Sequence, residues 1–120
     1  LKVAVVGSRD YKDDNKINAE LDSLKEQYGV DNIEIVTGGA RGVDQKAMEW
    51  ASNNNVGCEV VRPLVPSDKI SYLFRNVEIL TKSDLVVAFW DCKSRGTSFV
   101  IDYATARGKP LRVLKEENGD

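Results

Sequence analysis

The chain has 120 residues, of which 42% are hydrophobic and 30% charged, and its formal net charge is −2. These values are typical of one globular domain, and the slight acidity argues against a protein whose main task is to bind bulk nucleic acid. The chain has no histidine, which excludes serine–histidine–aspartate triads, cysteine–histidine pairs and histidine-ligated zinc.

Short apolar runs alternate with amphipathic stretches in the first half of the chain. The run KVAVVG at 2–7 predicts a strand, because it is rich in valine and ends at a glycine. A helix follows, begun by Asp13 or Asp14 and ended by Gly29, with inward positions at Ile17, Leu21, Leu24 and Tyr28. A second strand is predicted over 33–39. The next helix has inward positions at Val43, Ala47, Trp50 and Ala51.

The same alternation continues to the end of the chain. A third strand is predicted over 57–63, where a proline stops it, and a helix over 67–83 with Leu73, Val77 and Leu80 inward. The nearly continuous apolar run at 84–91 predicts a fourth strand, covered on both faces. A helix over 96–108 and a strand over 110–115 complete the pattern. The acidic tail at 116–120 is expected to fray.

This βαβαβαβαβ order predicts an α/β fold over residues 1–115, namely a three-layer Rossmann-like domain with a five-stranded parallel sheet. The expected strand order is 3-2-1-4-5. A crevice should then open at the carboxyl ends of strands 1 and 4, where open α/β sheets bind ligands.

Three loops with glycine and arginine follow strands 1, 2 and 4, at 7–10, 37–44 and 90–98. We expect them to meet at one edge of the sheet and to bind a phosphate through backbone amides and guanidinium groups. The alternative is that the glycines only satisfy turn geometry and the arginines are solvated. The candidate ligand-binding residues are Gly7, Ser8, Arg9, Thr37, Gly38, Gly39, Ala40, Arg41, Gly42, Asp44, Trp90, Ser94, Arg95, Gly96, Thr97 and Ser98.

Some of these residues have two readings. Asp44 could contact the ligand or interact with its helix end or with Arg41, and Trp90 could belong to the core or stack on a base. Asp91 could accept a bond from a ribose hydroxyl. Neither GxxxxGK[ST] nor GxGxxG is present, so the standard nucleotide-binding fingerprints do not apply.

The remaining features suggest no cofactor, metal or membrane. Cys58 and Cys92 fit no metal-ligand spacing and are expected to be free thiols of a cytoplasmic protein. No apolar run approaches the roughly 18 residues of a membrane span.

Four segments together resemble the SLOG superfamily, the Rossmann-like group that includes DprA and the lonely-guy (LOG) phosphoribohydrolases. They are VAVVGSRDY, IVTGGARGVDQKAMEWA, RNVEILTKSDLVVAFWD and SRGTSFVIDYATARGKPLRV. The resemblance is strongest to the small stand-alone YspA-like branch, found in bacteria and phages. It implies a nucleotide-type ligand, self-association as a dimer, and binding roles for the TGGARGVD residues and for Asn76.

The resemblance to the LOG enzymes distinguishes positions expected to bind a phosphate from positions expected to catalyse glycosidic cleavage. A catalytic arginine of those enzymes corresponds to Arg75, and the GT of their phosphate loop to Gly96 and Thr97. Their catalytic glutamate corresponds to Val100, which cannot assist glycosidic cleavage, and Asp102 should point elsewhere.

The sequence therefore predicts a domain that binds a nucleotide or nucleotide-derived ligand as a sensor, sponge or processing protein. One alternative is a nucleotide hydrolase assisted by Arg75 with Asp91 or Asp10. Others are DprA-like single-stranded DNA binding, which the acidic charge argues against, and a domain that only mediates assembly.

Overall fold

A computed structural model describes residues 1–116. Its elements in chain order are β1 (Lys2–Gly7), α1 (Asp14–Tyr28), the 3-10 turn η1 (Val30–Asn32), β2 (Glu34–Thr37), α2 (Val43–Asn53), β3 (Gly57–Val60), α3 (Lys69–Lys82), β4 (Leu85–Trp90), α4 (Arg95–Ala106) and β5 (Leu111–Lys115). The strict alternation predicted from the apolar runs is confirmed.

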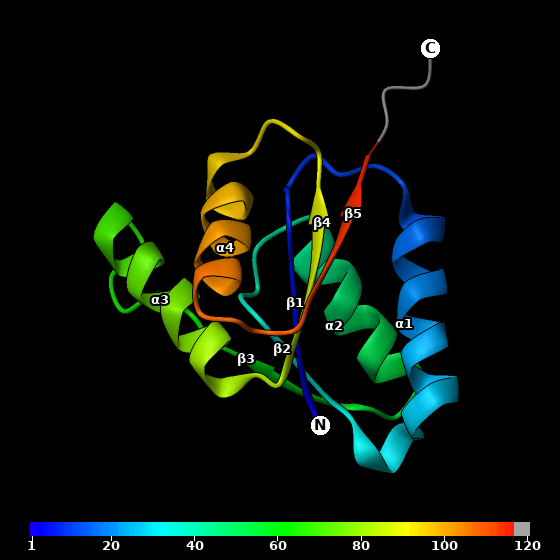
Figure 1. Ribbon diagram of the computed structural model, residues 1–120. Helices are drawn as coiled ribbons and strands as arrows, with labels where there is room; N and C mark the ends of the chain where they lie inside the picture. The colour runs from blue at the N-terminus through cyan, green and yellow to red at the C-terminus, as the bar shows by residue number, and fades with distance from the viewer. Residues whose placement is uncertain (117–120) are drawn as a thin grey trace.

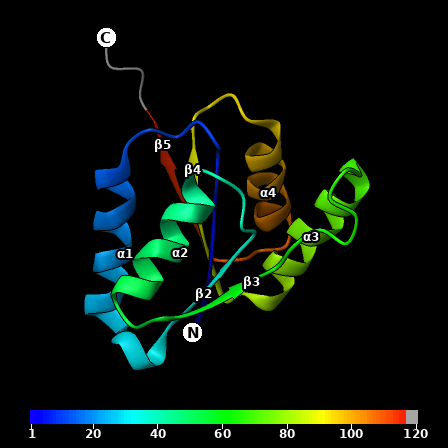
Figure 2. The same cartoon turned by 180° about the vertical axis from the view of Figure 1, so that it is seen from behind.

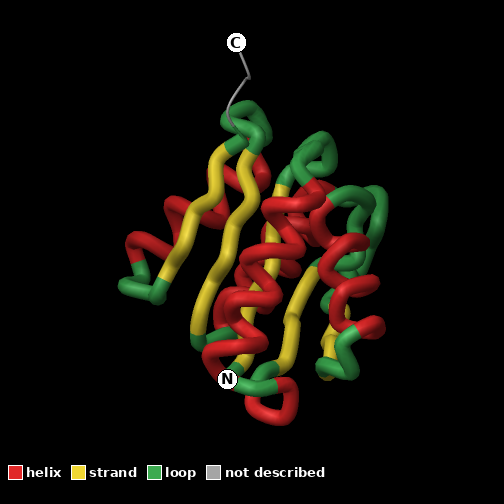
Figure 3. Tube along the Cα trace, turned by 90° about the vertical axis from the view of Figure 1, so that its right-hand side faces the viewer, coloured by secondary structure: helices red, strands yellow, loops and turns green. Residues whose placement is uncertain are grey.

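The five strands form one parallel sheet in the order β3-β2-β1-β4-β5, which confirms the predicted topology. β1 lies at the centre, with Val3 opposite Ile35 on one side and Leu85 on the other. Helices α1 and α2 cover one face of the sheet, and α3 and α4 cover the other (Figures 1 and 2). Figure 1 views the sheet nearly edge-on between these helical layers, and Figure 3, turned by 90°, shows its strands side by side.

The two faces of the central strand supply two cores. Val3 and Val5 belong to the cluster under α1 and α2, whereas Ala4 and Val6 belong to the cluster under α3 and α4. Successive side chains of a strand point to opposite faces, so a central strand between two helical layers must be apolar at every position. This requirement explains the unbroken valine-rich runs of β1 and β4.

Helix ends follow the capping residues of the sequence. The Asp13 carboxylate accepts a bond from the Lys16 amide at 3.0 Å, and Gly29, with φ of 85°, ends α1. Asp68 caps α3 through the Ile70 amide at 3.1 Å.

Helix α3 is rotated relative to expectation. Leu80 is buried as predicted, but Leu73 is 46% exposed, so its inward assignment is wrong. Ile79 and Leu80 are the apolar side chains that α3 buries, and they fix its rotation against the sheet. Tyr28, also expected inward, is 37% exposed at the end of α1. Cys58 and Cys92 are free and exposed.

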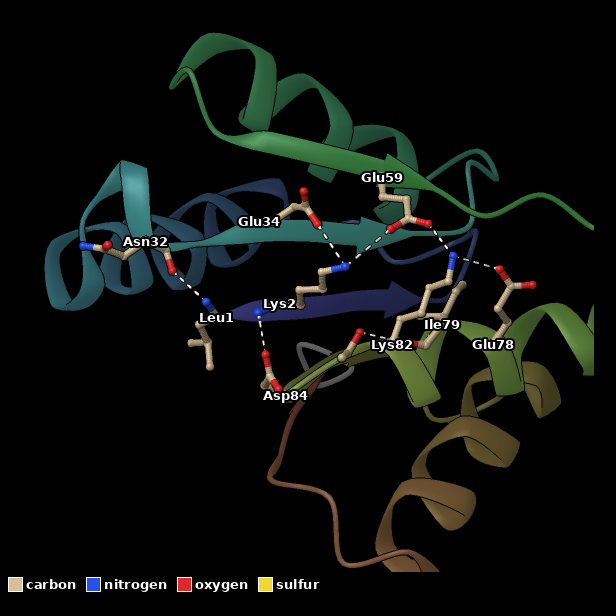
Figure 4. Close-up of polar contacts among 10 residues, drawn as sticks. Leu1, Lys2, Asn32, Glu34, Glu59, Glu78, Ile79, Lys82 and Asp84 are labelled. Atoms are coloured by element: carbon tan, nitrogen blue, oxygen red, sulfur yellow. Dashed lines mark hydrogen bonds and ion pairs between the residues drawn. The ribbon is translucent and has the colours of Figure 1, made fainter.

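A charged network crosses the start of the sheet (Figure 4). Lys2 Nζ lies 3.6 Å from a carboxylate oxygen of Glu34 and 3.9 Å from one of Glu59, and Lys82 contacts both Glu59 and Glu78. The hydrogen bond between Lys82 and Glu59 lowers the pKa of Glu59 and raises that of Lys82. These side chains are solvated, so the network contributes little to stability but links β1, β2, β3 and α3.

The predicted tail at 116–120 lies outside the described residues except for Glu116. The Glu116 carboxylate accepts bonds from the amides of Lys12 (2.6 Å) and Asp13 (3.1 Å). The end of β5 is thereby tied to the loop that follows β1. Within residues 1–116, no helix has both the length and the apolar character needed to cross a bilayer.

Candidate functional site

The loops after β1, β2 and β4 converge on one cleft of about 550 Å³. It opens beside β1 and β4, where the order of the strands in the sheet reverses, which is the position at which open α/β sheets bind ligands. Its lining residues are Val6, Gly7, Arg9, Asp10, Ala40, Asp44, Tyr72, Arg75, Asn76, Ile79, Asp91, Lys93, Ser94, Gly96, Thr97 and Val100.

The cleft carries both signs of charge. Its cations are Arg9, Arg75 and Lys93, and its carboxylates are Asp10, Asp44 and Asp91. A balanced lining of this kind suits a ligand with a compact anionic group and hydroxyl donors better than a long polyanion. Among residues 1–116, no group of three or more carboxylate or thiol side chains is arranged to hold a metal ion.

The loop from β4 to α4 is braced by its own polar groups. Asp91 Oδ1 accepts bonds from the amides of Lys93 (2.9 Å) and Ser94 (2.8 Å). Ser94 then caps α4, because its hydroxyl accepts the Thr97 amide at 3.4 Å and its carbonyl accepts the Ser98 amide at 3.2 Å. The first amides of a helix have no intrahelical acceptor, so those of Arg95 and Gly96 are available to an anion.

Gly96 leaves space at this helix start. A Cβ built on it would meet no atom within 4 Å, and Gly96 itself lines the cleft. Ser8, the residue after β1, supports this loop through its side chain. Its hydroxyl accepts a hydrogen bond from the Asp91 amide at 3.1 Å and lies 3.3 Å from the Thr97 hydroxyl. The free amides are therefore held in place by contacts that do not use them.

The electrostatics of Asp91 disfavour an acid role. Burial opposes ionisation, but the hydrogen bonds from the Ser94 and Lys93 amides outweigh it and lower the pKa of Asp91. The group is therefore a carboxylate at neutral pH, with no proton to donate. Asp91 also lines the cleft, so its carboxylate can accept a hydrogen bond from a ligand hydroxyl.

The loop from β2 to α2 has a different structure from the expected bare cradle. Gly39 and Gly42 have φ of 74° and 83°, and a Cβ on Gly42 would lie 2.6 Å from the Arg9 carbonyl oxygen. Glycine is needed there for turn geometry and for close approach of two loops. Ala40 and Asp44 are the only residues of 37–44 that line the cleft.

A partly buried hydrogen bond made by Arg75 joins this loop to α3. Arg75 Nη1 donates to the Gly38 carbonyl at 2.8 Å, and Nε donates to Asn76 at 2.9 Å. Asp44 Oδ2 accepts the Ala40 amide at 3.2 Å. Burial raises the pKa of Asp44, against the opposing effects of the Ala40 amide and the Arg75 charge, and burial lowers the pKa of Arg75. Arg75 thus holds the wall of the cleft as well as facing into it.

The structure sorts the candidate residues into two groups. Those that line the cleft are Gly7, Arg9, Ala40, Asp44, Arg75, Asn76, Asp91, Ser94, Gly96 and Thr97. Those that do not are Ser8, Thr37, Gly38, Gly39, Arg41, Gly42, Trp90, Arg95 and Ser98. A ligand contact for this second group stays a prediction.

Several of the second group have evident structural roles. The Thr37 hydroxyl donates to the Val5 carbonyl at 2.8 Å, within the sheet. The Trp90 indole donates to the Ser94 carbonyl at 3.0 Å, and Lys115 lies over its ring, so Trp90 braces the loop between β4 and α4. Arg41 and Arg95 are exposed.

Tyr72 and Lys93 line the cleft but were absent from the candidates. Tyr72 could have been found from its spacing, because it lies three and four residues before Arg75 and Asn76 and so shares their helix face. Lys93 lies within the loop already singled out.

Comparisons with known proteins agree with this architecture. The model of the "YspA, cpYpsA-related SLOG family" matches residues 1–65. No curated protein matches the sequence.

Two solved structures share the fold. DNA processing protein A (DprA) from Helicobacter pylori, described for its single-stranded DNA binding mode, has a TM-score of 0.76 and 25% identity, and the match covers 100% of this chain and 67% of that one. DprA from Streptococcus pneumoniae has a TM-score of 0.83 and 20% identity, with 99% of this chain covered. The present chain spans 52% of that protein.

These neighbours correct one expectation. Nucleic acid was set aside as a partner because of the net charge of −2, but the fold matches that of a protein with a single-stranded DNA binding mode. The net charge averages over the whole surface, so a small negative value does not exclude a local contact with nucleic acid.

Proposed function

Because the chain belongs to the YspA, cpYpsA-related SLOG family, we propose that its cleft binds a nucleotide or nucleotide-derived ligand through a phosphate group. The observation that carries the proposal is the start of α4. The available amides of Arg95 and Gly96 adjoin open space in a cleft that also contains Arg9 and Lys93.

The rest of the cleft suits the nucleoside part of such a ligand. Its volume of about 550 Å³ lies within the usual range for small-molecule sites. The Tyr72 ring offers an aromatic surface for a base, and the Asp91 carboxylate offers an acceptor for a ribose hydroxyl.

We favour binding over hydrolysis. Val100 lines the cleft at the position of the LOG glutamate and is 2% exposed, so the wall there is apolar. Asp102 is exposed and does not line the cleft, and the lowered pKa of Asp91 leaves it without a proton for a leaving group.

The test is a thermal-shift and calorimetry series with inorganic phosphate, AMP, ADP and ATP. Arg9→Ala should weaken binding about tenfold or more, because it removes a charged donor from the cleft. The matched control is Arg107→Ala, since Arg107 is exposed at the end of α4 and does not line the cleft. Equal effects of the two variants, or no binding of any compound, would count against the proposal.

Turnover is measured on the same samples by chromatography for released base. Release that disappears in a folded Arg75→Ala variant would replace the binding proposal with the hydrolase alternative. Because Arg75 also holds the Gly38 carbonyl, the fold of that variant must be checked by circular dichroism.

Single-stranded DNA is the second candidate, and the Helicobacter pylori neighbour is the observation that favours it. A gel-shift series over salt concentration tests this candidate, because each neutralised phosphate adds to the salt slope. If an oligonucleotide binds much more tightly than AMP, and the salt dependence of its affinity corresponds to several phosphate contacts, the ligand is single-stranded DNA. If the two bind equally tightly, and the salt dependence corresponds to about one phosphate contact, the ligand is a mononucleotide.

A further inference from the structure

The turn after β1 supplies two of the charged residues that line the cleft, Arg9 and Asp10. They are the central residues of a turn that is closed by a hydrogen bond of 3.3 Å from the Tyr11 amide to the Ser8 carbonyl. Within residues 1–116, the main chain of Arg9 and Asp10 makes no hydrogen bond of its own. The position of these two residues is therefore set by packing and by the residues on either side of the turn.

The entry of the turn is fixed by the sheet and by the neighbouring loop. The Ser8 amide donates to the Phe89 carbonyl of β4 at 3.0 Å. Gly42, before α2, packs so closely that a Cβ on it would lie 2.6 Å from the Arg9 carbonyl oxygen. This packing stops the turn from moving toward α2. It holds the turn only weakly against movement away from α2, because the attraction between each pair of non-bonded atoms is small.

The exit of the turn is held by the end of β5. Glu116 Oε2 accepts hydrogen bonds from the amides of Lys12 (2.6 Å) and Asp13 (3.1 Å). Lys16 Nζ donates to the Lys115 carbonyl at 3.2 Å, which is a second tie between the same two segments. β5 is an edge strand that does not pair with β1, and the loop reaches it by passing the ends of β4 and β5 on its way to α1 (Figures 1 and 2).

The Glu116 carboxylate is a strong restraint on this exit. Hydrogen bonds to an ionised acceptor are roughly twice as strong as neutral ones, and this carboxylate accepts two from consecutive amides. The side chains of Lys12 and Asp13 are exposed, so packing holds this end of the loop mainly through the Tyr11 ring, which lies edge-on to Phe89 at 5.5 Å. Glu116 therefore fixes the direction in which the chain leaves the turn.

We infer that Glu116 is a positioning residue for the cleft, because it holds the turn in the conformation from which Arg9 binds the phosphate. This inference rests on the proposed function, in which Arg9 is a phosphate donor. Glu116 does not line the cleft and lies outside the residues 1–65 that the family model matches. Its effect passes through the turn: a turn that is ordered before binding loses less conformational freedom when the ligand arrives, so the affinity is higher.

The first experiment measures amide hydrogen exchange by NMR without ligand. Glu116→Ala should speed the exchange of the Lys12 and Asp13 amides roughly 10- to 100-fold, because both lose a charged acceptor. Asp84→Ala is the matched control, since the Asp84 carboxylate accepts a hydrogen bond from the Lys2 amide at 2.8 Å at the opposite end of the sheet (Figure 4). It should leave exchange at residues 12 and 13 unchanged. Circular dichroism confirms that the variants are folded.

The second experiment is calorimetry with AMP, ADP and ATP. Glu116→Ala should weaken binding about 3- to 10-fold, whereas Asp84→Ala should leave it unchanged. Glu116→Gln should bind within about twofold of the unmodified chain, because its carboxamide oxygen can accept the same amides. This rescue separates the hydrogen bonds of Glu116 from its charge, since a purely electrostatic role would change both Glu116 variants alike.

The third experiment is a double-mutant cycle with Arg9→Ala. In that background Glu116→Ala should change the affinity less than about twofold, because the turn no longer carries the donor that Glu116 positions. A general structural role would instead make the two losses of affinity multiply.

Three results would overturn the inference while leaving the proposed function intact. They are unchanged exchange of the Lys12 and Asp13 amides in Glu116→Ala, nucleotide affinity that is unchanged or higher in that variant, and losses that multiply with those of Arg9→Ala. Absence of nucleotide binding by the unmodified chain would contradict the proposed function itself, and the role of Arg9 with it.

Discussion

Replacing Gly96 by alanine should separate folding from ligand binding. Gly96 is the second residue of α4, its φ is not positive, and a Cβ there would meet no atom within 4 Å. Alanine is favoured over glycine inside a helix by up to about 1 kcal/mol, and by roughly half of that in the first turn. The variant should therefore melt about 2–4 °C higher than the unmodified chain.

The same methyl group should weaken binding. It would occupy the space beside the Arg95 and Gly96 amides, where we place the phosphate. Loss of charge-assisted hydrogen bonds of about 1.5–3 kcal/mol corresponds to roughly a 10- to 100-fold weaker affinity.

Differential scanning fluorimetry without ligand measures the first effect, and calorimetry with the tightest-binding nucleotide measures the second. The control is Gly57→Ala on β3, where a Cβ would make ordinary 3.6 Å contacts with Glu34, far from the cleft. An unchanged nucleotide affinity in Gly96→Ala would show that the phosphate does not lie at the start of α4.

The other predictions concern the packing around the cleft. Gly42→Ala should lose about 2–3 kcal/mol in urea unfolding, because φ of 83° is strained for alanine and its Cβ would lie 2.6 Å from the Arg9 carbonyl oxygen. A loss below 0.5 kcal/mol would contradict this close approach. Tyr11→Phe should raise the free energy of unfolding by about 1 kcal/mol, because the buried Tyr11 hydroxyl has no hydrogen-bond partner among the described residues. Burial, followed by the charges of Asp13 and Glu116, raises the pKa of Tyr11 from 10.0 to about 12. The Tyr11 hydroxyl therefore loses its proton at a lower pH in the unfolded chain than in the folded protein. Between pH 10 and 12 the free energy of unfolding of the unmodified protein should fall by up to about 2 kcal/mol, and that of Tyr11→Phe should fall correspondingly less in parallel urea titrations.

The sheet could be predicted from the sequence because parallel strands between two helical layers leave a strong signal. The valine-rich runs of β1 and β4 are apolar at successive positions, and short glycine-ended runs separated by helical patterns leave few topologies open. The meeting of three loops at one edge then follows from the parallel arrangement alone.

The detail of the cleft could not be predicted in the same way. A glycine that permits close packing, such as Gly42 against Arg9, has the same sequence signature as a glycine that faces an anion. The rotation of α3 was also ambiguous, since Ile70, Leu73 and Phe74 give it a second apolar face beside the one formed by Ile79 and Leu80. Periodicity alone cannot tell which face is covered by the chain itself.

The contacts of Ser8 with Asp91 and Thr97 have a kinetic consequence. Because they hold the start of α4 before any ligand arrives, little loop ordering remains to slow association. Related ligands should consequently associate at similar rates, and their selectivity should appear as different residence times in a stopped-flow or surface plasmon resonance measurement.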